Sequence, residues 1–202
     1  MTEKISHEER QRLYELLPLE SIYPISKELI DDIIDKSDII VVKKGEPLIA
    51  EGDCNKDIYI LLDGIMRVWH WDADTEKTDY FGTAGTICVC YHCYLMNKAA
   101  PSSIEACSDS RVLRIRKSVY NNLLTGNPEF ALYIIGNLQM QSMFYEKMYS
   151  TFQGTAYERY LSMCRHRPEI VKEVSLKNIA SYLGITPTYL SRIRKKIASE
   201  LF

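Results

Sequence analysis

The C-terminal stretch, residues 174–202, constrains the fold of this chain more than any other. Between residues 174 and 197 apolar side chains recur at helical spacing in two sets, and Gly184 separates the sets. Ser175 is a suitable N-cap for the first helix, and Gly184 can adopt the positive φ that ends it. Thr186 followed by Pro187 is a typical start for the second helix. Two short helices joined by a glycine-containing turn form the signature of a helix-turn-helix.

Positive charge distinguishes the second of these helices from an ordinary packing helix. Four cationic residues follow its start: Arg192, Arg194, Lys195 and Lys196. The apolar positions leave these side chains a face of their own, and a helix of this kind can lie in the major groove of duplex DNA. A solvated basic face on a small helical bundle is the alternative interpretation. The glycine turn and the Thr186-Pro187 start favour DNA binding.

The charge of the whole chain is unevenly distributed. The net charge is −2, but residues 153–202 hold nine Lys and Arg against four Asp and Glu, which leaves +5. Residues 1–152 therefore hold 16 basic and 23 acidic side chains, or −7. Only the C-terminal part has the charge to bind a polyanion through phosphate contacts.

The string IASYLGITPTYLSRIRKKI, residues 179–197, resembles the helix-turn-helix of the Crp/Fnr family of bacterial transcription regulators. In that family an IAxxLG helix precedes a recognition helix with a Ser-Arg pair near its middle. By position, the resemblance assigns base reading to Thr186, Pro187, Thr188, Ser191 and Arg192. Arg192 is the candidate for a bidentate guanine contact, worth about 1–3 kcal/mol of discrimination. Lys177, Lys195 and Lys196 are expected to contact phosphates.

Residues 37–116 are predicted to form many short strands. Runs such as IIVVKKG, DIYILLDG and SRVLRIR are separated by turn residues, a pattern typical of a β-sandwich or barrel. Asp63-Gly64, between two apolar runs, predicts a hairpin. The stretch KKGEPLIAEGDCNKDIYILLDGIMRVW, residues 43–69, resembles the first half of the family's cyclic-nucleotide-binding-type barrel. Packing helices are expected before it, at residues 7–17 with Ser6 as N-cap and at residues 26–36 with Ser26 as N-cap.

The candidate effector pocket departs from the nucleotide-binding members of that family. Those members bind the cyclic phosphate with a Gly-Glu pair and, about ten residues later, an Arg-Ser/Thr pair. The resemblance places Gly85-Thr86 and Ala100-Pro101 at these positions, so the cationic partner is missing. A phosphodiester is costly to bury without one, and Lys98 nearby does not replace an Arg fork, so we do not expect tight binding of cyclic AMP. The candidate pocket residues are Gly85, Thr86, Ser102 and Ser103.

Six cysteines in a chain without a secretion signal are expected to be reduced thiols. The densest group, Cys88, Cys90, His92 and Cys93, raises the question of a zinc or iron-sulfur site. A strand here would direct Cys88 and Cys90 to one face and Cys93 to the other, which favours buried, unreactive thiols. No metal or other cofactor is therefore predicted. No catalytic motif is visible, including the metal-binding HxH pairs of cupin-like enzymes, so the sequence does not indicate an enzyme.

Pro128 is predicted to open a long helix that reaches about residue 152. Alternating spacings of four and three select a heptad-like seam: Ile134, Leu138, Gln141, Tyr145, Met148 and Phe152. A core helix under the barrel is the alternative. Because the helix is long and follows the barrel directly, and because the family resemblance implies the same, a two-fold dimer seam is favoured.

Together these patterns predict an α+β chain with three parts. Residues 1–125 form a jelly-roll-like β-barrel with flanking helices, residues 126–153 a dimerisation helix, and residues 154–202 a winged helix-turn-helix. The predicted function is that of a dimeric transcription regulator whose partners are a pseudo-palindromic DNA operator, a second copy of the chain and RNA polymerase. A ligand-binding or scaffolding module whose basic helix contacts a protein partner is the alternative. The chain lacks a run of about 20 apolar residues, and we expect a cytoplasmic protein without membrane contact.

Overall fold

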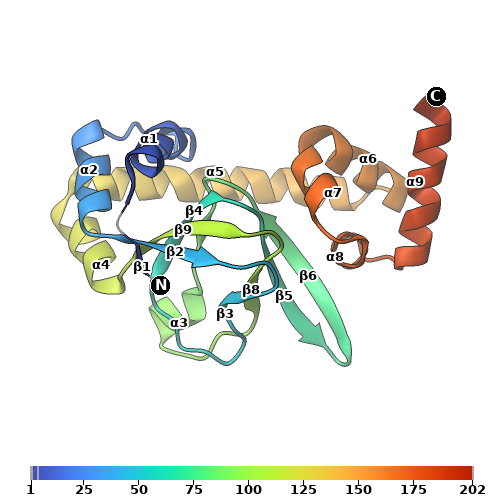
Figure 1. Cartoon of the computed structure of the whole chain (residues 1–202), viewed down its shortest axis with the longest axis horizontal. Coiled ribbons are helices and arrows are strands. Elements are labelled where there is room, and N and C mark those ends of the chain that lie inside the picture. Colours follow the sequence, from blue (N-terminus) through green and yellow to red (C-terminus); the bar gives the residue numbers. More distant parts are fainter. Residues whose placement is uncertain (1, 4, 202) are drawn as a thin grey trace.

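The computed structural model describes residues 2, 3 and 5–201; for residues 2, 3, 149–152, 200 and 201 it describes the backbone alone. Two antiparallel sheets form a barrel below a long helix (Figure 1). In spatial order, the first sheet contains β1 (Thr2–Glu3), β2 (Asp38–Val42), β9 (Ser110–Ile115), β4 (Ile58–Asp63) and β7 (Ile87–Cys88). The second contains β3 (Pro47–Ile49), β8 (Ser103–Ala106), β5 (Met66–Asp72) and β6 (Thr75–Gly82). The predicted α+β class with an N-terminal two-sheet β domain is confirmed.

Strand β4 lies between two apolar layers, which explains its unbroken apolar sequence. Tyr59 and Leu61 pack inside the barrel with residues of β8 and β9. Ile58, Ile60 and Leu62 point to the opposite face and pack under the helices. Because successive side chains alternate between the faces of a sheet, a strand that is covered on both faces reads as a continuous apolar run.

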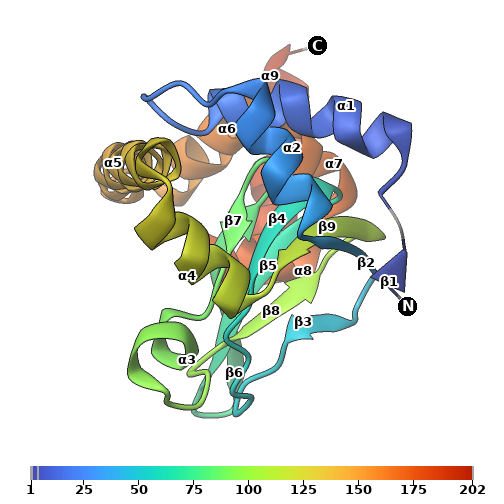
Figure 2. The same ribbon diagram turned by 90° about the vertical axis from the view of Figure 1, so that its left-hand side faces the viewer.

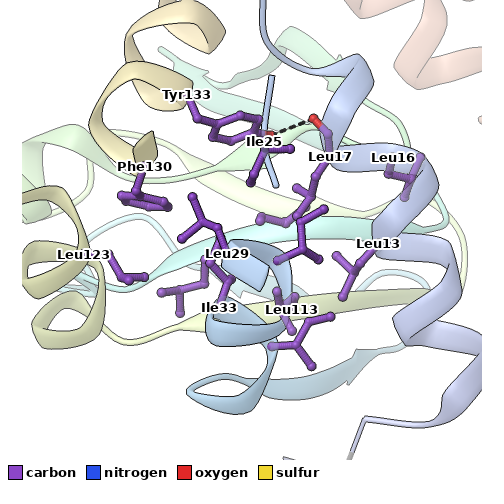
Figure 3. Packing of buried hydrophobic residues seen from close by; sticks show 14 of the residues in the cluster. Leu13, Leu16, Leu17, Ile25, Leu29, Ile33, Leu113, Leu123, Phe130 and Tyr133 are labelled. Carbon is purple, nitrogen blue, oxygen red and sulfur yellow. Dashed lines mark hydrogen bonds between the residues drawn. The ribbon is translucent and has the colours of Figure 1, made fainter. Parts of the chain in front are cut away.

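Helices cover the outer face of the first sheet. They are α1 (His7–Leu16), the short 3-10 helix η1 (Leu17–Leu19), α2 (Lys27–Asp35), α4 (Lys117–Gly126) and the first part of α5 (Pro128–Phe152). Figure 2 shows α1 and α2 lying over the barrel, with α5 seen nearly end-on beside them. Ser6 and Ser26 cap α1 and α2 as predicted. The helices and sheet share one apolar core, in which the Tyr133 hydroxyl donates to Leu17 O at 3.0 Å (Figure 3).

The prediction of a hairpin at Asp63-Gly64 is wrong. Gly64 does adopt a positive φ of 96°, but β4 and β5 on either side of it belong to different sheets. Both edges of β4 are already paired, with β7 and β9, so β5 crosses to the second sheet and pairs with β6 and β8. Ile65 N donates to Ser108 Oγ at 3.0 Å as the chain crosses. The hairpin of this region joins β5 to β6 instead, through Ala73 at φ 51°.

The C-terminal part consists of four helices joined by short turns in its described residues. It contains α6 (Ala156–His166), α7 (Pro168–Glu173), α8 (Leu176–Tyr182) and α9 (Pro187–Leu201). Helix α7 was not predicted, because Pro168 both follows one helix and opens the next, as proline can at a first helical position. No strand occurs among residues 153–201, so the predicted wing is not seen. No helix in the described part of the chain combines the length and the hydropathy that crossing a bilayer requires.

Candidate nucleic-acid interface and barrel pocket

The turn between α8 and α9 is built as the sequence indicates. Ser175 Oγ accepts from Asn178 N at 3.2 Å at the start of α8, and Gly184 has a φ of 65° after its end. Thr186 Oγ1 accepts from Tyr189 N at 3.2 Å, and Pro187 is the first residue of α9. These contacts help to fix the direction in which α9 leaves α8, since each helix has a side-chain cap for one N–H group of its first turn.

Helix α9 has a buried face and a cationic face. Leu190 and Ile193 are buried in the apolar cluster of α6–α9. Arg192 and Lys195 lie on the opposite side and are exposed. In the described part of the chain no acidic side chain forms an ion pair with either of them. Figure 1 shows α9 at the far end of the molecule, away from the barrel. The cationic face therefore points to solvent.

Two of the predicted phosphate contacts have partners within the chain. Lys177 Nζ lies 3.1 Å from Glu76 Oε1 of β6, and Lys196 Nζ lies over the Tyr157 ring, 5.0 Å from its centroid. Partial burial acts to raise the pKa of Glu76, but hydrogen bonds from Lys177 and Arg67 outweigh it and lower the pKa. Thr186, Pro187 and Thr188 are exposed at the start of α9, and Ser191 is half-buried.

A buried arginine joins the barrel to α8, and sequence reasoning missed it. Arg67 on β5 is only 5% exposed. Its Nε lies 3.1 Å from Glu105 Oε1, its Nη2 lies 3.1 Å from Glu76 Oε2, and its Nη1 donates to Asn178 Oδ1 of α8 at 3.1 Å. An arginine inside the otherwise apolar run IMRVW is the sequence signal for such a site, since a buried guanidinium requires partners.

Helix α8 is further attached to the edge strand β6. Ser181 Oγ donates to Glu76 O at 2.8 Å and accepts from Thr78 N at 2.9 Å. Ile65 and Phe81 of the barrel also belong to the apolar cluster that holds the C-terminal helices together. The helix pair is therefore packed against the barrel by both polar and apolar contacts.

The barrel and α5 enclose a pocket of about 470 Å³. Aromatic side chains line much of it, among them Tyr80, Tyr91 and Phe144, and Asp79 and Glu20 supply acidic groups. Neither Lys nor Arg is among the lining residues. Burial raises the pKa of the Glu20 carboxyl. The pocket therefore offers apolar surface and negative charge, but no counter-charge for a phosphate.

The four residues predicted to form the effector pocket are not brought together. Thr86 lines the pocket, whereas Gly85 faces the Glu20 side chain, which a Cβ at this position would overlap. Ser103 Oγ accepts from Glu51 N at 2.9 Å and is buried, and neither Ser102 nor Ser103 lines the pocket. This corrects the expectation, because the alternation of β8 directs Ile104, not Ser103, into the pocket.

Ala100, which the family resemblance aligns with an arginine, is held by backbone hydrogen bonds to the 50–54 turn. Ala100 is buried, its N–H donates to Asp53 O at 2.7 Å, and its carbonyl accepts from Gly52 N at 2.9 Å. Its methyl group packs in the barrel interior.

The cysteine segment is not a strand beyond Cys88. Cys90 is the N-cap of α3 (Tyr91–Met96), and its Sγ accepts from Cys93 N at 3.4 Å. The expectation that strand alternation would separate Cys90 from Cys93 is therefore wrong. All six cysteines are free thiols. In the described residues no three His, Cys, Asp or Glu side chains are arranged to hold a metal ion.

The predicted seam on α5 mixes residues of different faces. Ile134 is 8% exposed and belongs to the chain's own core, so it is not available to a second copy. Gln141 Nε2 donates to Asn137 Oδ1 at 3.0 Å and lines the pocket, and the sulfur of Met148 accepts from the Tyr182 hydroxyl at 3.5 Å. Leu138 and Tyr145 are exposed, although Tyr145 also packs near the Tyr80 ring. The Phe152 side chain lies outside the described residues.

Comparisons with known proteins agree with this architecture. Residues 39–127 match the family model described as "Cyclic nucleotide-binding domain". The c-di-GMP responsive regulator CLP of Xanthomonas campestris has a TM-score of 0.69 at 14% identity, over 87% of this chain and 93% of that one. FixK2 of Bradyrhizobium japonicum has a TM-score of 0.67 at 18% identity, over 81% of this chain and 85% of that one. The Catabolite Activator Protein of Thermus thermophilus has a TM-score of 0.52 at 16% identity, over 87% of this chain and 85% of that one. No curated protein matches the chain significantly. The chain thus contains a cyclic nucleotide-binding domain and shares its fold with structures in the Crp/Fnr regulator family.

Proposed function

We propose that this chain, with a cyclic nucleotide-binding domain in residues 39–127, is a dimeric, sequence-specific DNA-binding transcription regulator of the Crp/Fnr type. The observation that carries the proposal is the exposed face of α9. Arg192 and Lys195 point to solvent there, opposite the buried Leu190 and Ile193, in a chain whose remaining charge is negative. A cationic helix preceded by a fixed turn is suited to the major groove.

Within this proposal the residues of α9 divide into two roles. Arg192 lies in the middle of the exposed face and can approach the O6 and N7 atoms of a guanine. Thr188 lies one turn earlier on the same face and is suited to a second base contact. Lys195 is the better candidate for a phosphate contact than Lys196, because Lys196 already lies over the Tyr157 ring.

The barrel supplies the sensing part of the proposed function, but not as a cyclic-nucleotide receptor. Its pocket has no Lys or Arg, and Ala100 stands where the nucleotide-binding members have arginine. Phe144 of α5 and Tyr80 of β6 line this pocket and also a neighbouring one of about 430 Å³ that reaches α6, α7 and α8. An occupant of the barrel would thus contact the helix that leads to α8 and α9 and bias their packing.

The test is selection of bound sequences from random duplexes, followed by titration of the selected site and a scrambled duplex at several salt concentrations. Arg192→Ala should reduce discrimination between the two duplexes by about tenfold or more. Lys195→Ala should weaken both alike and reduce the salt slope by about one. Lys98→Ala removes an exposed charge from the barrel and serves as the matched control, with affinity unchanged. Cyclic AMP or cyclic GMP should not alter the affinity.

Equal effects of Arg192→Ala and Lys195→Ala on both duplexes would contradict the assignment of base reading. An affinity that does not fall with salt would contradict DNA binding itself and favour the alternative, in which the basic helix contacts a protein partner. A shift in DNA affinity at micromolar cyclic nucleotide would show that the barrel binds the nucleotide without the arginine.

A further inference from the structure

Two cysteine side chains meet at the start of α3. Cys90 is the N-cap and Cys93 is the third residue of the helix, the spacing at which an N-cap side chain meets the first turn. The Cys93 thiol donates to Cys90 Sγ, and the two sulfur atoms are 2.8 Å apart. A disulfide bond is about 2.05 Å long, so the sulfurs need to approach by less than about 1 Å to be joined. We propose that Cys90 and Cys93 form a reversible dithiol–disulfide site that reacts with small-molecule disulfides.

The pair lies one layer below the surface. Cys90 is 9% exposed and Cys93 is fully buried. The flanking Tyr91 and His92 are exposed, and so is the turn at residues 51–54, whose Asp53 carbonyl oxygen lies 3.5 Å from Cys93 Sγ. A small oxidant therefore needs only a local opening of α3, a helix of six residues, to reach Cys90.

The two sulfurs are suited to different roles. Burial and the neighbouring Cys90 sulfur raise the pKa of Cys93 to about 12. Cys93 therefore remains a thiol at neutral pH and donates its proton toward Cys90. Cys90 receives both the backbone N–H and the thiol of Cys93, and it is the more exposed of the two. Cys90 is accordingly the attacking sulfur and Cys93 the resolving one.

The reaction proceeds by two exchanges. The Cys90 thiol loses its proton to water, and the resulting thiolate attacks one sulfur of a small-molecule disulfide. The S–S bond of that disulfide breaks, and the released thiolate takes up a proton. Cys93 then loses its proton to water and attacks Cys90 Sγ in the mixed disulfide, which releases the second small thiol. The cysteine pair loses two electrons and two protons, and the small-molecule disulfide is reduced to two thiols. An excess of small thiol reverses both steps.

The other cysteines lack this arrangement. Cys88 and Cys107 are buried, and burial raises the pKa of Cys107 to about 11. Among the residues that the structure describes, no other two thiols are in hydrogen-bond contact. Cys54 is exposed and is the competing site for a mixed disulfide. Tyr91, between the two cysteines, lines the barrel pocket, so oxidation of the pair would change the shape of the pocket at Tyr91.

The experiment uses the native, reduced full-length chain and glutathione disulfide. After exposure, we expect the mass of the intact protein to fall by two hydrogen atoms. Alkylation should then modify four of the six thiols, and treatment with dithiothreitol before alkylation should restore all six. Trypsin leaves Cys88, Cys90 and Cys93 in one peptide, since no Lys or Arg lies between residues 78 and 97. The Cys88→Ser variant therefore identifies the linked pair by mass, and Cys54→Ser tests the competing site; both should still form the bond.

Neither Cys90→Ser nor Cys93→Ser should form the disulfide bond. Circular dichroism should show that both variants are folded. Six alkylated thiols in oxidised wild-type protein, an adduct on Cys54 alone, or a bond that includes Cys54 would each overturn the proposal. None of these results depends on DNA binding, so this site and the proposed function fail or succeed separately.

Discussion

Glu9 is the residue that attaches the N-terminal helix to the barrel. Its Oε2 accepts from Ser6 N and Ser6 Oγ at 2.8 Å each, which completes a capping box on α1. Arg111 Nε of β9 donates to Oε1 at 2.7 Å. Partial burial acts to raise the pKa of Glu9, but the Ser6 and Arg111 contacts outweigh it, and the pKa is lowered.

We expect Glu9→Gln to reduce the free energy of unfolding by about 1–2 kcal/mol at pH 7, because it removes charge-assisted hydrogen bonds. A carboxyl whose pKa is lowered in the folded state stabilises fully above its unfolded pKa of 4.5 and loses this contribution as the pH falls through the folded value. In urea unfolding at pH 7 and pH 3.5, the difference in the free energy of unfolding between the wild type and Glu9→Gln should therefore be smaller at the lower pH. Glu8→Gln, exposed in the same turn, is the control; an equal loss there would contradict the argument.

At the scale of single residues, some roles could be predicted from the sequence and others could not. The Thr186-Pro187 helix start was predicted from local pattern, and Arg192 was assigned its role by the family resemblance; the structure has Arg192 exposed on α9. The meeting of Cys90 with Cys93 was not predicted, because the segment was interpreted as a strand although its CxxC spacing also fits the first turn of a helix. Arg67 was missed because its partners Glu105 and Asn178 are far apart in the sequence.

At the scale of elements, the contact between α8 and β6 determines how the helix pair is held. Ser181 Oγ bonds both Thr78 N and Glu76 O, so one side chain serves two backbone groups of the edge strand. In Ser181→Ala the Thr78 N–H loses its partner, which should cost about 1–3 kcal/mol. Hydrogen exchange should accelerate at Thr78 and through α8, but not at β4. Ser199→Ala, an exposed serine of α9, should leave exchange unchanged; unaltered exchange in Ser181→Ala would mean that the Ser181 hydrogen bonds do not hold α8 against β6.

The helices were easier to predict than the strand pairing, for a physical reason. A helix start depends on neighbours within one turn, so Ser6, Ser26 and Ser175 could be recognised from sequence. A strand's partner depends on which sheet edge is free. Gly64 therefore adopts the expected positive φ, but the strands on either side of it do not form a hairpin, because β4 is already paired on both sides.

At the scale of the whole molecule, an apolar surface is left exposed by the described part of the chain. On α5 it consists of Leu132, Ile135, Leu138 and Met143, all exposed. The segment that carries the exposed Leu19 and Ile22 lies against the same helix. It is held there by hydrogen bonds from Ser21 Oγ to Tyr133 O at 2.8 Å and from Asn137 Nδ2 to Glu20 O at 2.7 Å. Gly136 allows the close approach, since a side chain there would collide with Ser21 Oγ. Exposed patches of this kind commonly mark interfaces between proteins.

The dimer of the proposed function should therefore use this surface and not the seam through Ile134. Ile135 is 47% exposed, and Ile135→Glu should convert the dimer to a monomer in light scattering coupled to size-exclusion chromatography without lowering the Tm of the monomer. Leu95→Glu, at a 69% exposed position on α3, is the matched control and should leave the dimer intact. Ile134→Ala should instead destabilise the fold by about 2–4 kcal/mol, since it opens a cavity in the core. If the dimer survives Ile135→Glu, the interface does not lie on this face of α5. The spacing of about 34 Å between paired α9 helices, on which DNA recognition depends, would then have to come from a different interface.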